Sequence, residues 1–170
     1  MPTFIALLRA VNVGGTGKLP MTDLNQLCCT AGLEKVQTYI ASGNVVFDTK
    51  KTASEVKAAL EASLQRYAGK PVGVVIRTGA EMAAVLENNP FAGAPANRTV
   101  AIFLDAAPPR DALDHITGRD DEEVALGRRE IYVRYGESMG RSKLKIPAAA
   151  QGTARNMNTV AKLAAMVRRR

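Results

Sequence analysis

Residues 36–47 read VQTYIASGNVVF, and the fold that the sequence predicts is built around this stretch. Two runs rich in β-branched and aromatic residues, 36–40 and 45–47, flank the four residues Ala-Ser-Gly-Asn. Such runs around a short glycine-containing segment are typical of a β-hairpin. The sequence therefore predicts two antiparallel neighbouring strands here.

The segments on either side of the hairpin complete a β-α-β-β-α-β order. Helical patterns lie at 22–31 and 54–67, and short apolar runs typical of strands lie at 4–9 and 72–77. This order is the split β-α-β pattern of ferredoxin-like domains, so we expect an α+β fold with a ferredoxin-like first half. Because the run 4–9 is apolar on both faces, we expect the second half of the chain, or a second subunit, to pack on the sheet.

A helical pattern at 81–88 and a loop rich in Ala, Gly, Pro and Asn separate this half from a second one. The predicted division is a ferredoxin-like half at 1–78, a connection at 79–98 and a second α+β half with basic C-terminal helices at 99–170. Within the second half the patterns predict strands at 99–105, 123–126 and 130–135 and helices at 109–117, 140–145 and 156–169. This order echoes the first half, as a degenerate ferredoxin-like repeat would.

The composition indicates a globular protein, with 46% hydrophobic and 23% charged residues. With no signal-peptide pattern and no apolar run of the roughly 20 residues that a membrane span needs, we expect a cytoplasmic protein without a membrane segment. The adjacent Cys28 and Cys29 suit neither a disulfide nor a metal clamp, and we predict no metal site and no cofactor.

The net charge is +7, and residues 128–170 carry 11 Lys and Arg against two Glu. This bias indicates either an anionic partner or a solvated basic surface.

Residues 12–18, NVGGTGK, are a candidate phosphate-binding loop. A Walker A loop needs glycine five positions before its Gly-Lys pair and Ser or Thr after the lysine, but Asn12 and Leu19 occupy those positions. A dinucleotide-binding fingerprint fails as well, because Pro20 stands where its third glycine would be. What remains is a glycine-rich connection. Either its backbone N–H groups face a ligand, or the segment is only a link to the next helix.

The predicted topology brings this loop and the hairpin turn to the same edge of the sheet. In a split β-α-β sheet the first strand ends where the tip of the following hairpin lies. Two polar, glycine-containing loops that converge at one edge are a plausible ligand site, and Lys70 enters the fourth strand there too. The ligand-binding residues predicted at this edge are Arg9, Asn12, Gly14, Gly15, Ser42 and Asn44.

A second polar cluster is predicted where the C-terminal helix begins, in GTARNMNTVAK at 152–162. Met157 and Val160 have the spacing of core residues, and Thr153 or Asn156 can cap the helix. Cations, side-chain amides and free N–H groups at a helix start suit an anion, although a capped surface helix with a solvated polar stripe fits as well. The predicted ligand-binding residues of this cluster are Arg155, Asn156, Asn158 and Lys162.

Four motifs resemble the bacterial family known as domain of unknown function 1697. They are FIALLRAVNVGGTGKLPM at 4–21, TYIASGNVVF at 38–47, GESMGRSKL at 136–144 and GTARNMNTVAKL at 152–163. The resemblance covers essentially the whole chain, and it implies an α+β fold with ferredoxin-like halves. Met157 stands where many members have tryptophan. The resemblance implies no reaction.

Three classes of function follow from these patterns. The favoured one is a binding or regulatory module for a phosphorylated small molecule or nucleotide, at a composite site of loop 12–18, hairpin 42–44 and helix start 155–162. The second is an enzyme acting on such a ligand, although these motifs offer mainly lysines and amides, and His115 and Cys28 lie elsewhere. The third is RNA binding on a sheet whose only stacking aromatics would be Phe4 and Phe47. The oligomeric state is left open.

Overall fold

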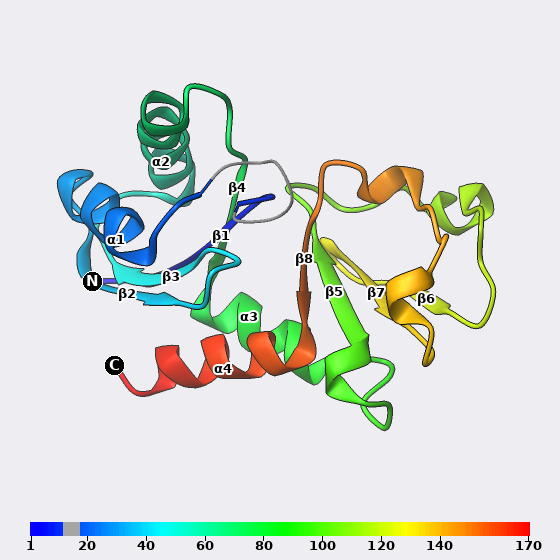
Figure 1. The fold of residues 1–170 in the computed structure, drawn as a ribbon. Helices are drawn as coiled ribbons and strands as arrows, with labels where there is room; N and C mark the ends of the chain where they lie inside the picture. The colour runs from blue at the N-terminus through cyan, green and yellow to red at the C-terminus, as the bar shows by residue number, and fades with distance from the viewer. Residues whose placement is uncertain (12–17) are drawn as a thin grey trace. The chain divides into compact units, whose positions relative to one another are not determined.

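The structure is a computed structural model that describes residues 1–11 and 18–170. In the described residues it has four α-helices and two four-stranded antiparallel sheets, which is an α+β fold (Figure 1). The chain clusters into two compact units. The first unit comprises Met1–Met82 and Leu163–Arg170, and the second comprises Ala83–Lys162.

The first unit follows the predicted β-α-β-β-α-β order. Its strand order is β2-β3-β1-β4, and β1 pairs antiparallel with both β3 and β4. Strands β1 and β2 are therefore parallel, with β3 between them, as the hairpin at 36–47 predicts. The elements are β1 (Thr3–Leu8), α1 (Met21–Thr30), β2 (Glu34–Tyr39), β3 (Asn44–Asp48), α2 (Ala53–Ala68) and β4 (Val74–Thr78), followed by α3 (Gly79–Glu87), which continues into the second unit at Ala83.

Helices α1 and α2 cover one face of this sheet, and together they enclose its main core (Figure 1). Leu24 and Cys28 from α1 and Leu60 and Leu64 from α2 are buried against the sheet. Helix α2 begins one residue before the predicted Ser54. A capping box accounts for this start, because the Thr52 hydroxyl accepts a hydrogen bond from the Glu55 N–H and the Glu55 carboxylate accepts one from the Thr52 N–H.

The opposite face of the sheet is also buried, and Ile5, Leu7 and Val46 are fully inaccessible there. Residues 163–170, which end helix α4, belong to this unit and lie on this face (Figure 1). The predicted second half, 99–170, thus differs from the observed units at its C-terminal end, because these residues cluster with the first sheet. The expectation that other parts of the chain cover the sheet is met by the chain's own last helix.

Arg170 joins this C-terminal segment to the sheet. Its guanidinium lies 3.1 Å from Asp48 Oδ1 and 2.6 Å from Gln37 Oε1, and it also donates to the Lys35 carbonyl. Burial raises the pKa of Asp48, but hydrogen bonds from Thr3 and Arg170 and the charges of Arg170 and Lys35 outweigh it, so the pKa lies below its usual value. The ion pair is largely shielded from water, since the two side chains are 10% and 12% exposed.

We expect Arg170→Ala to lower the free energy of unfolding by about 1.5 to 3 kcal/mol at pH 7, the usual value of a hydrogen bond to a charged group. Because the pKa of Asp48 is lowered by folding, this stabilisation is present above the unfolded carboxyl pKa of about 3.9 and is lost as the pH falls through the folded value. Urea unfolding of wild type and variant at pH 7 and pH 3 measures both effects. Arg169→Ala is the matched control, because among the described residues the ion pair to Asp48 is made by Arg170 and not by its neighbour. Equal losses in the two variants, or a loss independent of pH, would contradict the assignment.

The second unit has the strand order β6-β7-β5-β8, again fully antiparallel. Taken in chain order, β5 to β8 occupy the same places as β1 to β4, and helix α4 follows β8 as α3 follows β4. This shared order agrees with the degenerate repeat. The elements are β5 (Thr99–Phe103), β6 (Glu123–Leu126), β7 (Glu130–Arg134), β8 (Thr153–Asn156) and α4 (Met157–Arg168), with 3-10 turns at Ala96–Arg98, Ala112–His115, Met139–Arg141 and Pro147–Ala149.

Two predicted helices of the second half are wrong, and one strand was not predicted. The helices expected at 109–117 and 140–145 are only 3-10 turns, at 112–115 and 139–141. In the first of these turns only Ala112 is buried and Leu113 is 41% exposed, so no apolar face holds a longer helix to a core. The strand that was not predicted is β8 at 153–156, which pairs with β5 before the predicted C-terminal helix begins at Met157.

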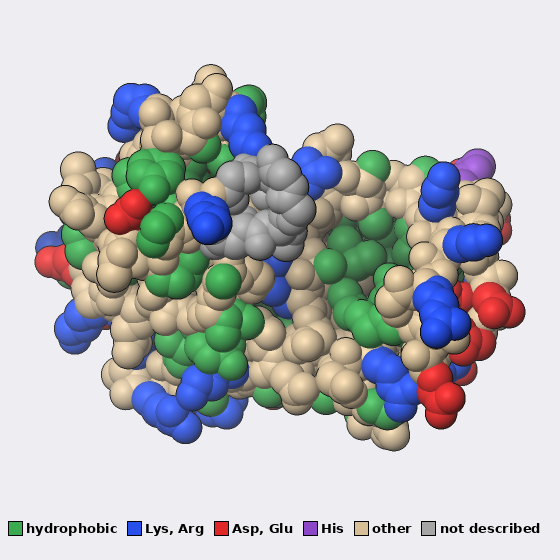
Figure 2. Space-filling view, in the orientation of Figure 1, with side chains coloured by type: hydrophobic (Ala, Val, Ile, Leu, Met, Phe, Trp, Pro, Cys, Tyr) green, Lys and Arg blue, Asp and Glu red, His purple; other side chains and the backbone are tan. Residues whose placement is uncertain are grey.

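One face of the second sheet lacks two long helices, so it is covered less completely than the face of the first sheet on which α1 and α2 pack. Ile131 and Val133 are buried there, whereas their apolar neighbours Ile102, Leu144 and Ile146 are only partly buried. Figure 2 shows hydrophobic side chains gathered in a hollow of the second unit. The segment 142–146 supplies part of the cover, and it is held by a bridge between Thr117 and Lys145.

Candidate functional site

Three segments of the first unit meet at one edge of its sheet. The Leu8 N–H donates to the Gly43 carbonyl at 2.9 Å, and the Arg9 N–H donates to the Gly73 carbonyl at 2.9 Å. The end of β1, the hairpin turn and the entry to β4 are therefore adjacent. This arrangement follows from the strand order, as the sequence predicts.

The hairpin turn is closely packed against β1. Gly43 has φ of +90°, and a Cβ on it would lie 2.9 Å from the Leu8 Cβ and 2.9 Å from the Val11 Cγ2. Asn44 is fully buried, and its Nδ2 donates to the Tyr39 carbonyl and the Ser42 hydroxyl, each at 2.9 Å. The predicted ligand residues of the hairpin thus use these polar groups to close the turn.

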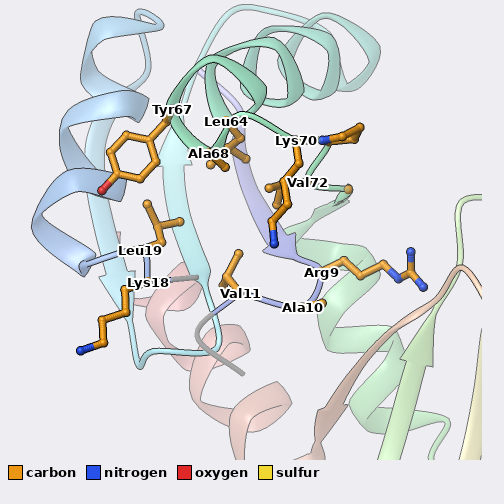
Figure 3. A pocket seen from close by; sticks show the side chains of 12 residues that line it. Arg9, Ala10, Val11, Lys18, Leu19, Leu64, Tyr67, Ala68, Lys70 and Val72 are labelled. Atoms are coloured by element: carbon orange, nitrogen blue, oxygen red, sulfur yellow. The ribbon is translucent and has the colours of Figure 1, made fainter. Parts of the chain in front are cut away.

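A cavity of about 510 Å³ opens at the same edge (Figure 3). Its floor is apolar, since Val11, Leu19, Leu64 and Val72 are buried. Neither Ser42 nor Asn44 is among the described residues that line it. The described lining consists of Arg9, Ala10, Val11, Lys18, Leu19, Leu64, Tyr67, Ala68, Lys70, Pro71, Val72 and Gly73. The predicted ligand residues Asn12, Gly14 and Gly15 lie outside the described residues.

Three cations and no carboxylate are found among the described lining residues. Lys70 extends from the start of the β4 entry toward the end of β1, whereas Lys18 points away from it (Figure 3). The stem of Arg9 lies over Gly73, where a Cβ would be 3.7 Å from the Arg9 Cβ. Within the described part of the chain, Lys18 and Lys70 make no ion pair. The cavity therefore combines positive charge with an apolar floor.

Tyr67 forms the end of the cavity opposite Arg9, and it bridges two helices. Its hydroxyl donates to Asp23 Oδ2 at 2.6 Å, which joins α2 to α1. This hydrogen bond, together with desolvation and the Asp23 charge, raises the pKa of Tyr67. The ring remains 45% exposed. Sequence reasoning placed Lys70 at the edge without including it in the site, and it missed Tyr67, whose position depends on the packing of two helices.

The second predicted cluster, at 155–162, lies in the second unit. Its side chains do not form the single polar face of a helix that their spacing predicts. Arg155 is buried on strand β8, where it pairs with Ala101, and burial lowers its pKa to about 10. Asn158 is exposed, so it does not share a face with Arg155. The stripe fails because the helix begins two residues after Arg155.

Other features of this segment agree with the sequence patterns. Asn156 caps the helix, since its Oδ1 accepts from the Thr159 N–H at 3.0 Å, and Met157 and Val160 are buried as predicted. Lys162 is partly buried at the end of the second unit. A ligand-binding role for Arg155, Asn156, Asn158 and Lys162 stays a prediction.

The other candidate chemical groups are not among the described residues that line the cavity. Burial, with a smaller effect of Cys29, raises the pKa of the Cys28 thiol to about 12. His115 lies on the surface of the second unit, 3.1 Å from Asp111 Oδ2. Glu122 accepts hydrogen bonds from Ser142 and the Asp120 N–H, which lower its pKa, and it thus holds a turn. No cluster of acidic, His or Cys side chains suited to a metal occurs in residues 1–11 and 18–170.

The two aromatic residues considered for RNA stacking are inside the core. Phe4 is 8% exposed and Phe47 is fully buried, and their rings stack on each other with centroids 6.2 Å apart. Bases cannot reach them while the helices cover this face. Among the described residues, none of the helices is both long and apolar enough to pass through a bilayer.

Comparisons with known proteins agree with the fold. A conserved bacterial protein from Streptococcus pneumoniae has a similar structure, with a TM-score of 0.80, 24% identity and coverage of 99% of both chains. No curated protein matches the sequence. A family model described as protein of unknown function (DUF1697) matches residues 1–132, which is most of the chain. The chain belongs to this DUF1697 family.

Proposed function

We propose that the cavity at the Arg9 edge binds a phosphorylated small molecule, and that the protein acts as a binding or regulatory module. The observation that carries this proposal is the position of Lys70. Its side chain enters a partly apolar cavity in which the described lining holds Arg9 and Lys18 but no carboxylate. A phosphate group that docks there gains charge-assisted hydrogen bonds without repulsion from the lining.

Lys70 is exposed, but the cavity that it borders has apolar walls. A ligand that covers Val11, Leu64 and Val72 displaces water from beside the lysine and so strengthens the attraction between opposite charges. A volume of about 510 Å³ falls in the usual range for small-molecule pockets. The described lining offers Lys, Arg and Tyr as its only titratable groups, which supports binding more directly than acid–base catalysis.

Ribose 5-phosphate is a suitable test ligand, since it carries one phosphate and no aromatic group. We expect it to bind wild-type protein in isothermal titration at low ionic strength, and more weakly as salt is added. Lys70→Gln should weaken binding at least about tenfold, because a hydrogen bond to a charged group is worth roughly 1.5 to 3 kcal/mol.

Lys50→Gln is the matched control for this experiment. Lys50 is also an exposed lysine of the first unit, but it follows β3, whose last residue Asp48 pairs with Thr3 at the start of β1. It therefore lies at the opposite edge of the sheet from Arg9. Absence of binding to wild-type protein, or equal weakening by both substitutions, would contradict the proposed site. Conversion of the bound ribose 5-phosphate into another compound, followed by NMR, would identify an enzyme instead.

A further inference from the structure

Tyr67 belongs to two neighbouring hollows of the first unit. It ends the cavity that holds Lys70, and it also lines a groove of about 530 Å³ between helices α1 and α2. The groove is lined by Asp23, Gln26, Leu27, Thr30, Ser63, Arg66 and Tyr67. A ligand bound beside Lys70 would therefore have the tyrosine ring next to it.

The ring of Tyr67 is held in place although it is exposed. Its hydroxyl is fixed to Asp23 Oδ2 at 2.6 Å, so the side chain spans from α2 to α1 (Figure 3). Leu64, one turn earlier on α2, packs in the core below it. A tethered aromatic ring can stack on a flat group with little loss of side-chain entropy, because its rotamer is already restricted.

The cations of the cavity favour one direction of a ligand. Lys70 and Arg9 attract an anion at the end near β1, whereas at the Tyr67 end Lys18 points away from the cavity and the Asp23 carboxylate of the neighbouring groove accepts the tyrosine hydroxyl (Figure 3). Between these ends lie the apolar side chains of Leu19 and Leu64. A negative group at one end and a flat, uncharged ring at the other would match this distribution.

We propose that the ligand is a mononucleotide, with its phosphate at Lys70 and its base against the ring of Tyr67. This inference rests on the proposed function, since it takes the phosphate position from it. The groove behind Tyr67 offers the amide of Gln26 and the hydroxyls of Thr30 and Ser63, which can hydrogen-bond the polar edge of a base. Stacking of the base on Tyr67 provides affinity, and hydrogen bonds from these polar groups determine which base is preferred.

The test compares AMP with ribose 5-phosphate, two probes that share the sugar phosphate and differ by the base. We expect wild-type protein to bind AMP about fivefold or more tightly than ribose 5-phosphate in isothermal titration, since stacking of a base on an aromatic side chain adds at least that much. Tyr67→Ala should reduce the ratio of the two dissociation constants to about one. Tyr67→Phe keeps the ring and should retain most of the ratio.

Each outcome separates this inference from the proposed function. Equal affinities for the two probes in wild-type protein, or a ratio that Tyr67→Ala leaves unchanged, would overturn the role of the base while the phosphate site stands. If neither probe binds, the proposed function falls and this inference falls with it. Because Tyr67 is 45% exposed, Tyr67→Ala should remain folded, which unchanged affinity for ribose 5-phosphate would verify.

Discussion

Gly43→Ala should lower the free energy of unfolding by about 3 kcal/mol, whereas Gly69→Ala should lower it by only about 1 kcal/mol. Both glycines have positive φ, +90° and +73°, so each substitution incurs the conformational cost of a side chain in the left-handed region. Of the two, only Gly43 faces a close contact with described residues, since its Cβ would lie 2.9 Å from atoms of Leu8 and Val11, whereas no described atom lies within 4 Å of a Cβ at Gly69. The difference between the two losses of unfolding free energy therefore measures the cost of the contact with Leu8 and Val11.

The hairpin cannot relieve this contact by moving away. The Gly43 carbonyl accepts the hydrogen bond of the Leu8 N–H at 2.9 Å, so a retreat of the turn would break the pairing at the end of β1. Urea unfolding followed by far-UV circular dichroism gives both free energies. Equal losses of unfolding free energy in Gly43→Ala and Gly69→Ala would show that the hairpin turn accommodates the added methyl group without an energetic cost.

Gly43→Ala should also affect the cavity. Val11, which the new methyl group would displace, lines the cavity beside Lys70. We therefore expect weaker binding of ribose 5-phosphate in Gly43→Ala than in Gly69→Ala, because a small shift in position weakens a charge-assisted hydrogen bond. This connects the conformation of the hairpin turn to the proposed function.

The first half of the fold was predictable because its signals are local and long enough. The runs at 36–40 and 45–47 are strongly β-forming, and α2 has three buried residues, Val56, Leu60 and Leu64, at helical spacing. Strand order then placed Arg9 and Lys70 at one edge without any knowledge of contacts. The same reasoning could not reveal that Asn44 turns inward to the Tyr39 carbonyl, because a side chain's hydrogen-bond partner depends on its surroundings.

The strand that was missed in the second half could not be predicted from its own residues. Strand β8 is four residues long and reads Thr-Ala-Arg-Asn, so its own propensity for a strand is weak and its pairing with β5 decides its conformation. The polar spacing from Arg155 to Lys162 resembles one helical face only if the helix is extended upstream through this strand. Tyr67 was missed for a related reason, since its importance comes from a contact with Asp23, 44 residues away.

Gly118→Ala should lower the free energy of unfolding by about 3 kcal/mol, and its effect should be confined to the second unit. Gly118 has φ of +70°, and a Cβ on it would lie 2.0 Å from the Lys143 carbonyl oxygen, which is backbone and cannot rotate away. The segment containing Lys143 is fixed by the Thr117 N–H and the Lys145 N–H, which donate to each other's carbonyls at 3.1 and 2.8 Å. The added methyl group must push this segment from the sheet, where Leu144 and Ile146 cover Ile131 and Val133.

Gly140→Ala is the control for this prediction, because no atom of residues 1–11 and 18–170 lies within 4 Å of its Cβ position and its φ is not positive. Hydrogen exchange of the Lys145 amide should accelerate in Gly118→Ala, while that of the Leu8 amide in the first unit should not. If Gly118→Ala and Gly140→Ala have the same free energy of unfolding, the segment 142–146 contributes little to the stability of the second unit.

Since every described residue that lines the Lys70 cavity belongs to the first unit, ribose 5-phosphate should bind Gly118→Ala as it binds wild type. Loss of binding in Gly43→Ala together with full binding in Gly118→Ala would assign the ligand site to the first unit by function as well as by geometry.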